Sequence, residues 1–232
     1  MFTMSQNKKQ LLIIVGPQGS GNHVFARIFS MHPEVDGWSE LTENYWVTHQ
    51  REKFAPYWWH PQLMKPEVFD NGQYFVTDIS YPYIYDGYIV NPKILEVANM
   101  AKSWGIDVQI AVIARDEKIN RLQQERIRKK STLDSAKDYI NDALLTSEFP
   151  VNFLSLETFF CYKTNYLKYL EKVLNFPIDH TSPEILKFID DQSPNEKYIV
   201  PIDTYPGDEL KGIIGEEIDV LFNPISERNK ND

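Results

Sequence analysis

Apolar and polar residues follow one another along this chain in two kinds of pattern, which predict strands separated by helices. Residues 11–15 form an unbroken apolar run and residues 108–114 a nearly unbroken one, as expected for strands buried in a parallel sheet. Two further strands are predicted at residues 73–79 and 151–156. Apolar residues at helical spacing predict helices around residues 24–29 and at residues 92–104, 118–130, 133–145 and 165–174.

This order of elements predicts the fold class. Strands that alternate with helices favour an α/β fold with a three-layer, doubly wound, mostly parallel sheet and right-handed crossovers. We expect a single domain over residues 1–232, with tails at 1–10 and 226–232 and an aromatic-rich insertion at 33–71. Ligands of such sheets bind at the carboxyl ends of the strands. The residues expected near this rim are Gly16, Asp78, Arg115 and Glu157.

The loop after the first predicted strand carries Gly16, Gly19 and Gly21 and leads directly into a helix. Such a P-loop-type strand, loop and helix offers unpaired backbone N–H groups and a helix dipole to phosphate or sulfate oxygens. The glycine spacing is that of a Walker A motif, but Asn22 and His23 stand where its Lys and Ser/Thr would be. The loop predicts a nucleotide site, and a turn that merely lets strand and helix pack closely is the simpler alternative.

Composition excludes several classes of function. The chain has a formal net charge of −9 and no long basic block, which disfavours nonspecific binding of nucleic acid or of a membrane surface. Cys161 is the single cysteine, so an intrachain disulfide is excluded and a cysteine-based zinc site is not expected. No apolar run approaches a membrane span or a signal peptide, so we expect a cytoplasmic protein.

Several segments, taken in order, resemble the sulfotransferase family. Residues 16–23 (GPQGSGNH) and 26–33 (ARIFSMHP) resemble that family's opening loop and the end of its first helix. Residues 112–116 (VIARD) resemble its strand ending in Arg-Asp-Pro, and residues 153–157 (FLSLE) its strand ending in Tyr-Glu-Asp. Residues 166–176 resemble the helix that closes on Phe-Leu-Gly.

The resemblance implies binding of 3′-phosphoadenosine 5′-phosphosulfate (PAPS) and transfer of its sulfuryl group to a hydroxyl or amine of a small-molecule or glycan acceptor, without a metal. Arg115 would bind the 3′-phosphate through paired charge-assisted hydrogen bonds. Gln123 stands where the family has a partner serine. The loop residues expected to hold the 5′-phosphosulfate are Gly16, Pro17, Gln18, Gly19, Ser20, Gly21, Asn22 and His23.

Gly19 occupies the loop position at which the family carries a catalytic lysine or arginine. Negative charge builds on the bridging oxygen of the departing nucleotide, and some cation or preorganised donor must meet it. His23 and Arg27 are the nearest candidates. Because the helix dipole disfavours a charged His23, we expect this side chain to serve as a neutral donor, and capping or packing against the loop is the equal alternative.

Residues 77–82 (TDISYP) resemble the family segment that lines the acceptor site, with Ile79 in place of its lysine. A turn before the proline explains the segment nearly as well. Tryptophans at 38, 46, 58 and 59 suggest an aromatic pocket or lid on the acceptor side, with core packing as the alternative. A general base is expected just beyond the first helix, with Glu40 as first choice, then Glu43 and His32.

Two other functions remain open. A nucleotide or small-molecule kinase would need ATP and magnesium, and the missing Lys and Ser/Thr of the loop argue against it. A catalytically degenerate nucleotide-binding protein would keep the cradle after losing the cation at Gly19.

Overall fold

The computed structural model describes residues 8–43, 51–85 and 88–190. At its centre is a five-stranded, wholly parallel sheet in the order β2-β3-β1-β6-β7. A separate antiparallel pair consists of β4 and β5. The strands are β1 (Gln10–Gly16), β2 (Val35–Asp36), β3 (Tyr74–Ser80), β4 (Tyr83–Tyr85), β5 (Tyr88–Val90), β6 (Asp107–Ala114) and β7 (Val151–Ser155).

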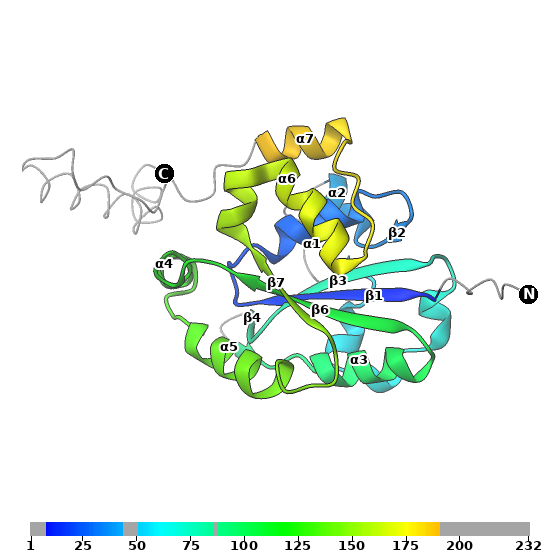
Figure 1. Ribbon diagram of the computed structural model, residues 1–232. Helices are drawn as coiled ribbons and strands as arrows, with labels where there is room; N and C mark the ends of the chain where they lie inside the picture. Colours follow the sequence, from blue (N-terminus) through cyan, green and yellow to red (C-terminus); the bar gives the residue numbers. More distant parts are fainter. Residues whose placement is uncertain (1–7, 44–50, 86–87, 191–232) are drawn as a thin grey trace, which may run out of the picture. The chain divides into compact units, whose positions relative to one another are not determined.

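Helices cover both faces of the sheet (Figure 1). Figure 1 shows α1, α2, α6 and α7 over one face and α3 and α5 over the other, with α4 beside the carboxyl ends of the strands. The helices are α1 (Asn22–Ser30), α2 (Ser39–Glu43), α3 (Ile94–Ser103), α4 (Glu117–Arg128), α5 (Leu133–Tyr139), α6 (Leu156–Leu174) and α7 (Pro183–Asp190). Three short 3-10 helices are η2 (Ala55–Trp58), η3 (Pro61–Leu63) and η4 (Pro66–Phe69), and η5 (Ile140–Leu144) is a π-helical turn.

Strand β1 separates two hydrophobic clusters because its side chains alternate between the faces of the sheet. Leu12 and Ile14 pack with the apolar faces of α1 and α6. Leu11, Ile13 and Val15 pack on the other side with α3 and the 3-10 helices. All five side chains are buried, which explains why this segment reads as an unbroken apolar run.

The predicted α/β class is confirmed, and the predicted strands and helices occur within a few residues of their expected bounds. Helix α6 begins at Leu156, earlier than expected, because two helical segments join across Lys163, whose φ is 44°. The elements within residues 33–71, namely β2, α2 and the three 3-10 helices, were not predicted, nor were the β4–β5 pair and α7. The predicted tail at 226–232 lies outside the described residues, as does the end of the expected domain, so the one-domain organisation stays a prediction.

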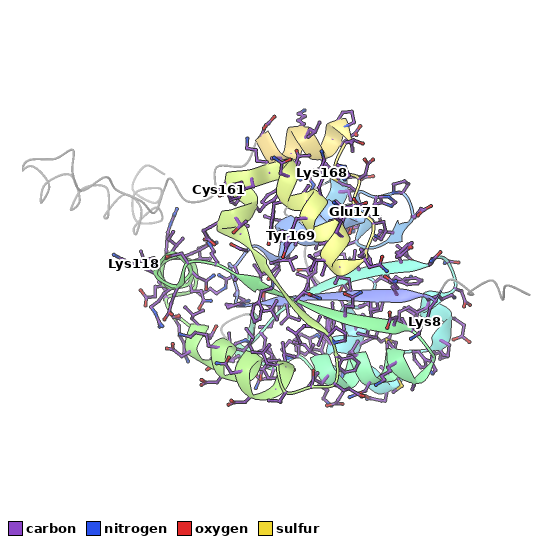
Figure 2. The ribbon with its side chains drawn as sticks, in the orientation of Figure 1. Lys8, Lys118, Cys161, Lys168, Tyr169 and Glu171 are labelled. Carbon is purple, nitrogen blue, oxygen red and sulfur yellow. The ribbon has the colours of Figure 1, made fainter. Side chains whose placement is uncertain are left out.

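Within the described residues, no helix is long and apolar enough to cross a membrane. The single cysteine, Cys161, is a free and exposed thiol on α6 (Figure 2). Figure 2 also shows Lys118 on α4 and Lys168, Tyr169 and Glu171 together on α6.

Candidate functional site

The glycine loop begins where β1 ends, at Gly16. The Ser20 amide donates to the Pro17 carbonyl at 3.0 Å, which closes the loop into a turn. Helix α1 then starts with the amide of Val24 donating to the Gly21 carbonyl at 3.0 Å. The amides of Asn22 and His23 precede that first bond, so the helix itself cannot satisfy them. This is the geometry in which backbone N–H groups bind an anion.

Two of the glycines are required by the backbone. Gly19 has a φ of 78° and Gly21 a φ of 107°, values that side-chain-bearing residues rarely adopt. A Cβ on Gly21 would lie 2.9 Å from Leu156 Cδ1, and one on Gly19 would lie 3.1 Å from Gln123 Cδ. A lysine at Gly19 would therefore be strained and crowded in this loop.

Polar side chains of the loop bind to the loop itself and to β3. Ser20 Oγ donates to Asn22 Oδ1 at 2.9 Å, and Asn22 Nδ2 donates to the Ile79 carbonyl at 3.3 Å and to Ser80 Oγ at 3.2 Å. A Cβ on Gly16 would lie 2.4 Å from Ser20 Oγ, so these side chains fill the space beside Gly16. The side chain of Asn22, at the Walker lysine position, therefore ties the loop to the sheet, and its contact with nucleotide stays a prediction.

Arg115 brings β6, α4 and the loop together. This arginine follows the last residue of β6, and its Nη1 donates both to the Gly19 carbonyl and to Gln123 Oε1. Next to Gln123 on α4, Gln124 Nε2 donates to the Gln18 carbonyl at 2.8 Å. The three predicted binding elements, Arg115, Gln123 and the glycine loop, thus lie in direct contact.

A pocket of about 290 Å³ lies next to this contact. Its polar lining includes Ser20, Arg115 and Asn120, and its apolar lining includes Val112 and Phe153. The walls come from the loop, β6, β7, α4 and α5. A ligand here would touch the arginine and the loop at once.

His23 forms an ion pair with a buried aspartate. Its Nδ1 lies 3.2 Å from Asp78 Oδ2, the Asp78 side chain is fully buried, and the Trp38 ring packs edge-on at 5.2 Å between centroids. Burial alone would lower the pKa of His23, but the charge of Asp78 and its hydrogen bond raise the pKa above the ordinary value. This direction runs against the expectation of a neutral His23, because the Asp78 carboxylate favours the charged imidazole.

Glu52 is an acidic residue of this region that the sequence did not reveal. Its carboxyl group is buried and accepts hydrogen bonds from the Thr77 hydroxyl and, at 3.4 Å, from Trp58 Nε1. Burial raises its pKa to about 8, with the charge of Asp78 acting in the same direction. Because Glu52 lies between Arg51 and Lys53 in the sequence, it looks like part of a solvated charge run, and no signal distinguishes it.

Arg27, predicted to face the departing nucleotide, points elsewhere. Its Nη2 donates to the Thr42 carbonyl at 2.8 Å, and its guanidinium lies 4.6 Å from the centre of the Phe188 ring. It lines a different pocket with Ser30 and Lys187. Arg27 lies one helical turn beyond His23, and its long side chain packs against α2 and α7 instead of the loop.

The three candidate bases differ in their surroundings. Glu40 lies in the first turn of α2, is about half exposed, and pairs with Arg51 at 3.3 Å. Glu43 is exposed at the end of the same helix. His32 Nδ1 accepts the Glu34 amide at 3.2 Å, a local turn contact. The contacts of the three residues bring none of them to the loop.

The tryptophans supply core area. Trp38 and Trp58 are 3% and 1% exposed, and Trp59 packs against the hydrophobic cluster that contains Leu11, Ile13 and Val15. The expectation of an aromatic acceptor pocket is therefore wrong for Trp38 and Trp58, because their large apolar surfaces are buried in the two cores. Trp46 lies outside the described residues.

Comparison with known proteins gives structural similarity at low sequence identity. No protein-family profile and no curated protein sequence matches this chain. A sulfotransferase domain from the curacin biosynthetic pathway is similar, with 11% identity and a TM-score of 0.45 over 80% of this chain and 78% of that one. Mouse sulfotransferase SULT7A1 complexed with PAP has 12% identity and a TM-score of 0.38, over 94% and 85%.

A structure from the PezAT chromosomal toxin-antitoxin system of Streptococcus pneumoniae has 11% identity and a TM-score of 0.33, over 81% of this chain and 87% of that one. At these values the similarities carry no conclusion about what this chain binds.

Proposed function

We propose that this protein is a sulfotransferase that takes the sulfuryl group from PAPS and transfers it to a hydroxyl or amine of a small-molecule or glycan acceptor. The observation that carries the proposal is the contact of Arg115 with both the Gly19 carbonyl and Gln123. A guanidinium beside a glycine-rich helix start offers two anion-binding features to one ligand. A nucleotide with a phosphate at its 3′ position and a phosphosulfate at its 5′ position carries two anionic groups, one for each of these features.

In the proposed reaction, the acceptor oxygen or nitrogen forms a bond to sulfur while the bond from sulfur to the bridging phosphate oxygen breaks. The electron pair of the broken bond stays on the departing nucleotide, and the acceptor's proton passes to a base. Glu40, the first candidate from the sequence, stays the proposed base; its carboxyl group is partly exposed and pairs with Arg51 instead of contacting the loop. The loop amides hold the charged oxygens during the transfer.

Calorimetric titration tests the nucleotide. We expect the product nucleotide 3′-phosphoadenosine 5′-phosphate to bind without magnesium, and ATP to bind far more weakly. Arg115→Ala should weaken binding of this product by about tenfold or more, because a charge-assisted contact is lost. Arg121→Ala is the matched control, since Arg121 lies on α4 but pairs with Glu117 and Asp134.

Equal affinity in Arg115→Ala and wild type would contradict the proposed site. Transfer of labelled sulfate from PAPS to a pool of hydroxyl and amine acceptors then tests catalysis itself. Tight binding of the nucleotide with no transfer would favour the second candidate, a nucleotide-binding protein without activity. The observation in favour of that candidate is the loop side chain of Asn22, which binds β3.

A further inference from the structure

His23 and Asp78 stand at two positions that have a known use in other P-loop proteins. In P-loop NTPases, a Ser/Thr of the loop and an aspartate elsewhere in the fold hold magnesium at the phosphates. His23 lies two residues after Gly21, at the Ser/Thr position of the Walker A motif. Asp78 lies on β3, the strand beside β1, where its Cα partner is Ile14. The pair therefore lies at the base of the glycine loop.

The two side chains bind one another there. His23 Nδ1 and Asp78 Oδ2 are 3.2 Å apart, the Asp78 side chain is fully buried, and that of His23 is 24% exposed. A fully buried carboxylate is stable only when a cation or hydrogen-bond donors compensate it. The imidazole of His23 supplies that compensation. His23 lies in the first turn of α1, where part of its side chain is exposed.

Among the described residues, further acidic groups lie on the elements around the pair. The charge of Asp78 raises the pKa of the buried carboxyl group of Glu52. Helix α2, which packs on α1, carries Glu40 and Glu43, of which Glu40 pairs with Arg51. Within the part of the chain that the structure describes, the charge of Asp78 and its hydrogen bond favour a positive imidazole, while burial and the amino end of α1 oppose it.

We propose that the imidazolium of His23, held by Asp78, acts at the glycine loop as the local cationic hydrogen-bond donor where P-loop NTPases use magnesium. His23 is then the catalytic residue, whose Nε2–H donates to the departing phosphate oxygen as the bond to sulfur breaks. That hydrogen bond stabilises the electron pair left on the oxygen, and the imidazolium keeps its proton. Asp78 is a positioning residue that holds Nδ1. This inference rests on the proposed function and names the cation that the loop lacks at Gly19.

The first test needs no ligand. In protein labelled with ¹⁵N-histidine, the His23 signal is assigned by its loss in His23→Gln. We expect the imidazolium of His23 to persist above the ordinary histidine pKa of about 6.5 and to lose its proton at lower pH in Asp78→Asn. His180→Gln is the matched control, because His180 also pairs with a carboxylate, Glu171, at 3.4 Å and has a 23% exposed side chain. A His23 that is neutral at pH 6.5 in the wild type would overturn the proposal.

The second test measures binding of 3′-phosphoadenosine 5′-phosphate and of pyrophosphate, each with EDTA and with magnesium. We expect the wild-type affinity for the product nucleotide to be unchanged by EDTA, and His23→Gln and Asp78→Asn to bind about tenfold or more weakly. Since Asp78→Asn alters a fully buried position, His23→Gln carries the test if Asp78→Asn does not fold. His180→Gln should bind like the wild type.

The outcomes separate this proposal from the proposed function. Nucleotide binding that depends on magnesium, or that His23→Gln leaves unchanged, would overturn the built-in cation while the nucleotide site remains. Magnesium-independent binding of pyrophosphate that His23→Gln weakens, without binding of the product nucleotide, would support the built-in cation and contradict the PAPS proposal.

Discussion

Glu52 and Asp78 bring two carboxyl groups into the interior near the glycine loop. Each is neutralised in a different way, because an unpaired buried charge is unstable. Asp78 pairs with His23, whereas burial raises the pKa of Glu52 to about 8, so that it keeps its proton at neutral pH.

Glu52 makes stability depend on pH. In the unfolded chain its proton leaves near pH 4.5, whereas in the folded protein it leaves near pH 8. The folded state binds more protons between these values, so this residue makes stability fall as pH rises through the window, by up to about 1.4 kcal/mol per pH unit. We expect Glu52→Gln to flatten that dependence, since the amide still offers an acceptor to Thr77.

Urea unfolding at about pH 5 and about pH 8 measures the difference. Glu67→Gln, at an exposed position, is the control and should follow the wild type. If Glu52→Gln loses as much stability between the two pH values as the wild type, Glu52 is ionised in the folded protein.

At the scale of elements, α4 carries Gln123, the predicted partner of Arg115, and the residues before its first turn fix its start. Asp116 caps the helix by accepting the Ile119 amide at 2.8 Å, while its own amide donates to Glu157 Oε1 at 3.0 Å. The cap immediately follows Arg115. The start of α4 and the orientation of Arg115 are therefore set by the same turn.

Asp116→Ala removes this cap. We expect a loss of about 1 kcal/mol of unfolding free energy, as is usual when an N-cap side chain is removed. Asp116→Asn retains an acceptor and should stay closer to the wild type. Thermal unfolding followed by circular dichroism measures both variants, and an equal loss in the two would point to the charge of Asp116 instead of its cap.

At the scale of the whole described unit, the loop is bound from two sides. Asn22 ties it to the end of β3, and Gln124 of α4 ties it to the helix layer through the Gln18 carbonyl. Gln124 Oε1 also accepts a hydrogen bond from the Thr132 amide at 2.7 Å, which joins α4 to the residue before α5. One buried amide side chain thus connects the loop and two helices.

Gln124→Ala should cost about 1–3 kcal/mol of unfolding free energy, because it leaves the buried carbonyl of Gln18 and amide of Thr132 with fewer partners. We also expect weaker binding of 3′-phosphoadenosine 5′-phosphate, since the loop loses the shorter of two hydrogen bonds that join the Gln18 carbonyl to α4. Glu125→Ala, one residue on and exposed, is the control and should stay within about 0.5 kcal/mol of the wild type. A wild-type denaturation midpoint for Gln124→Ala would show that the loop is held without this residue.

The sequence by itself determined the order of elements and the position of the glycine loop, because apolar periodicity and glycine placement are local properties. It also placed Arg115 at the end of a strand whose neighbours follow from the parallel topology. The tertiary structure alone decided the pairing of His23 with a buried carboxylate, the burial of Glu52 and the direction of Arg27. Each of these depends on a partner far along the chain, Asp78, Thr77 and Phe188 respectively. A side chain's pKa and direction follow from burial and long-range contacts, which no local pattern contains.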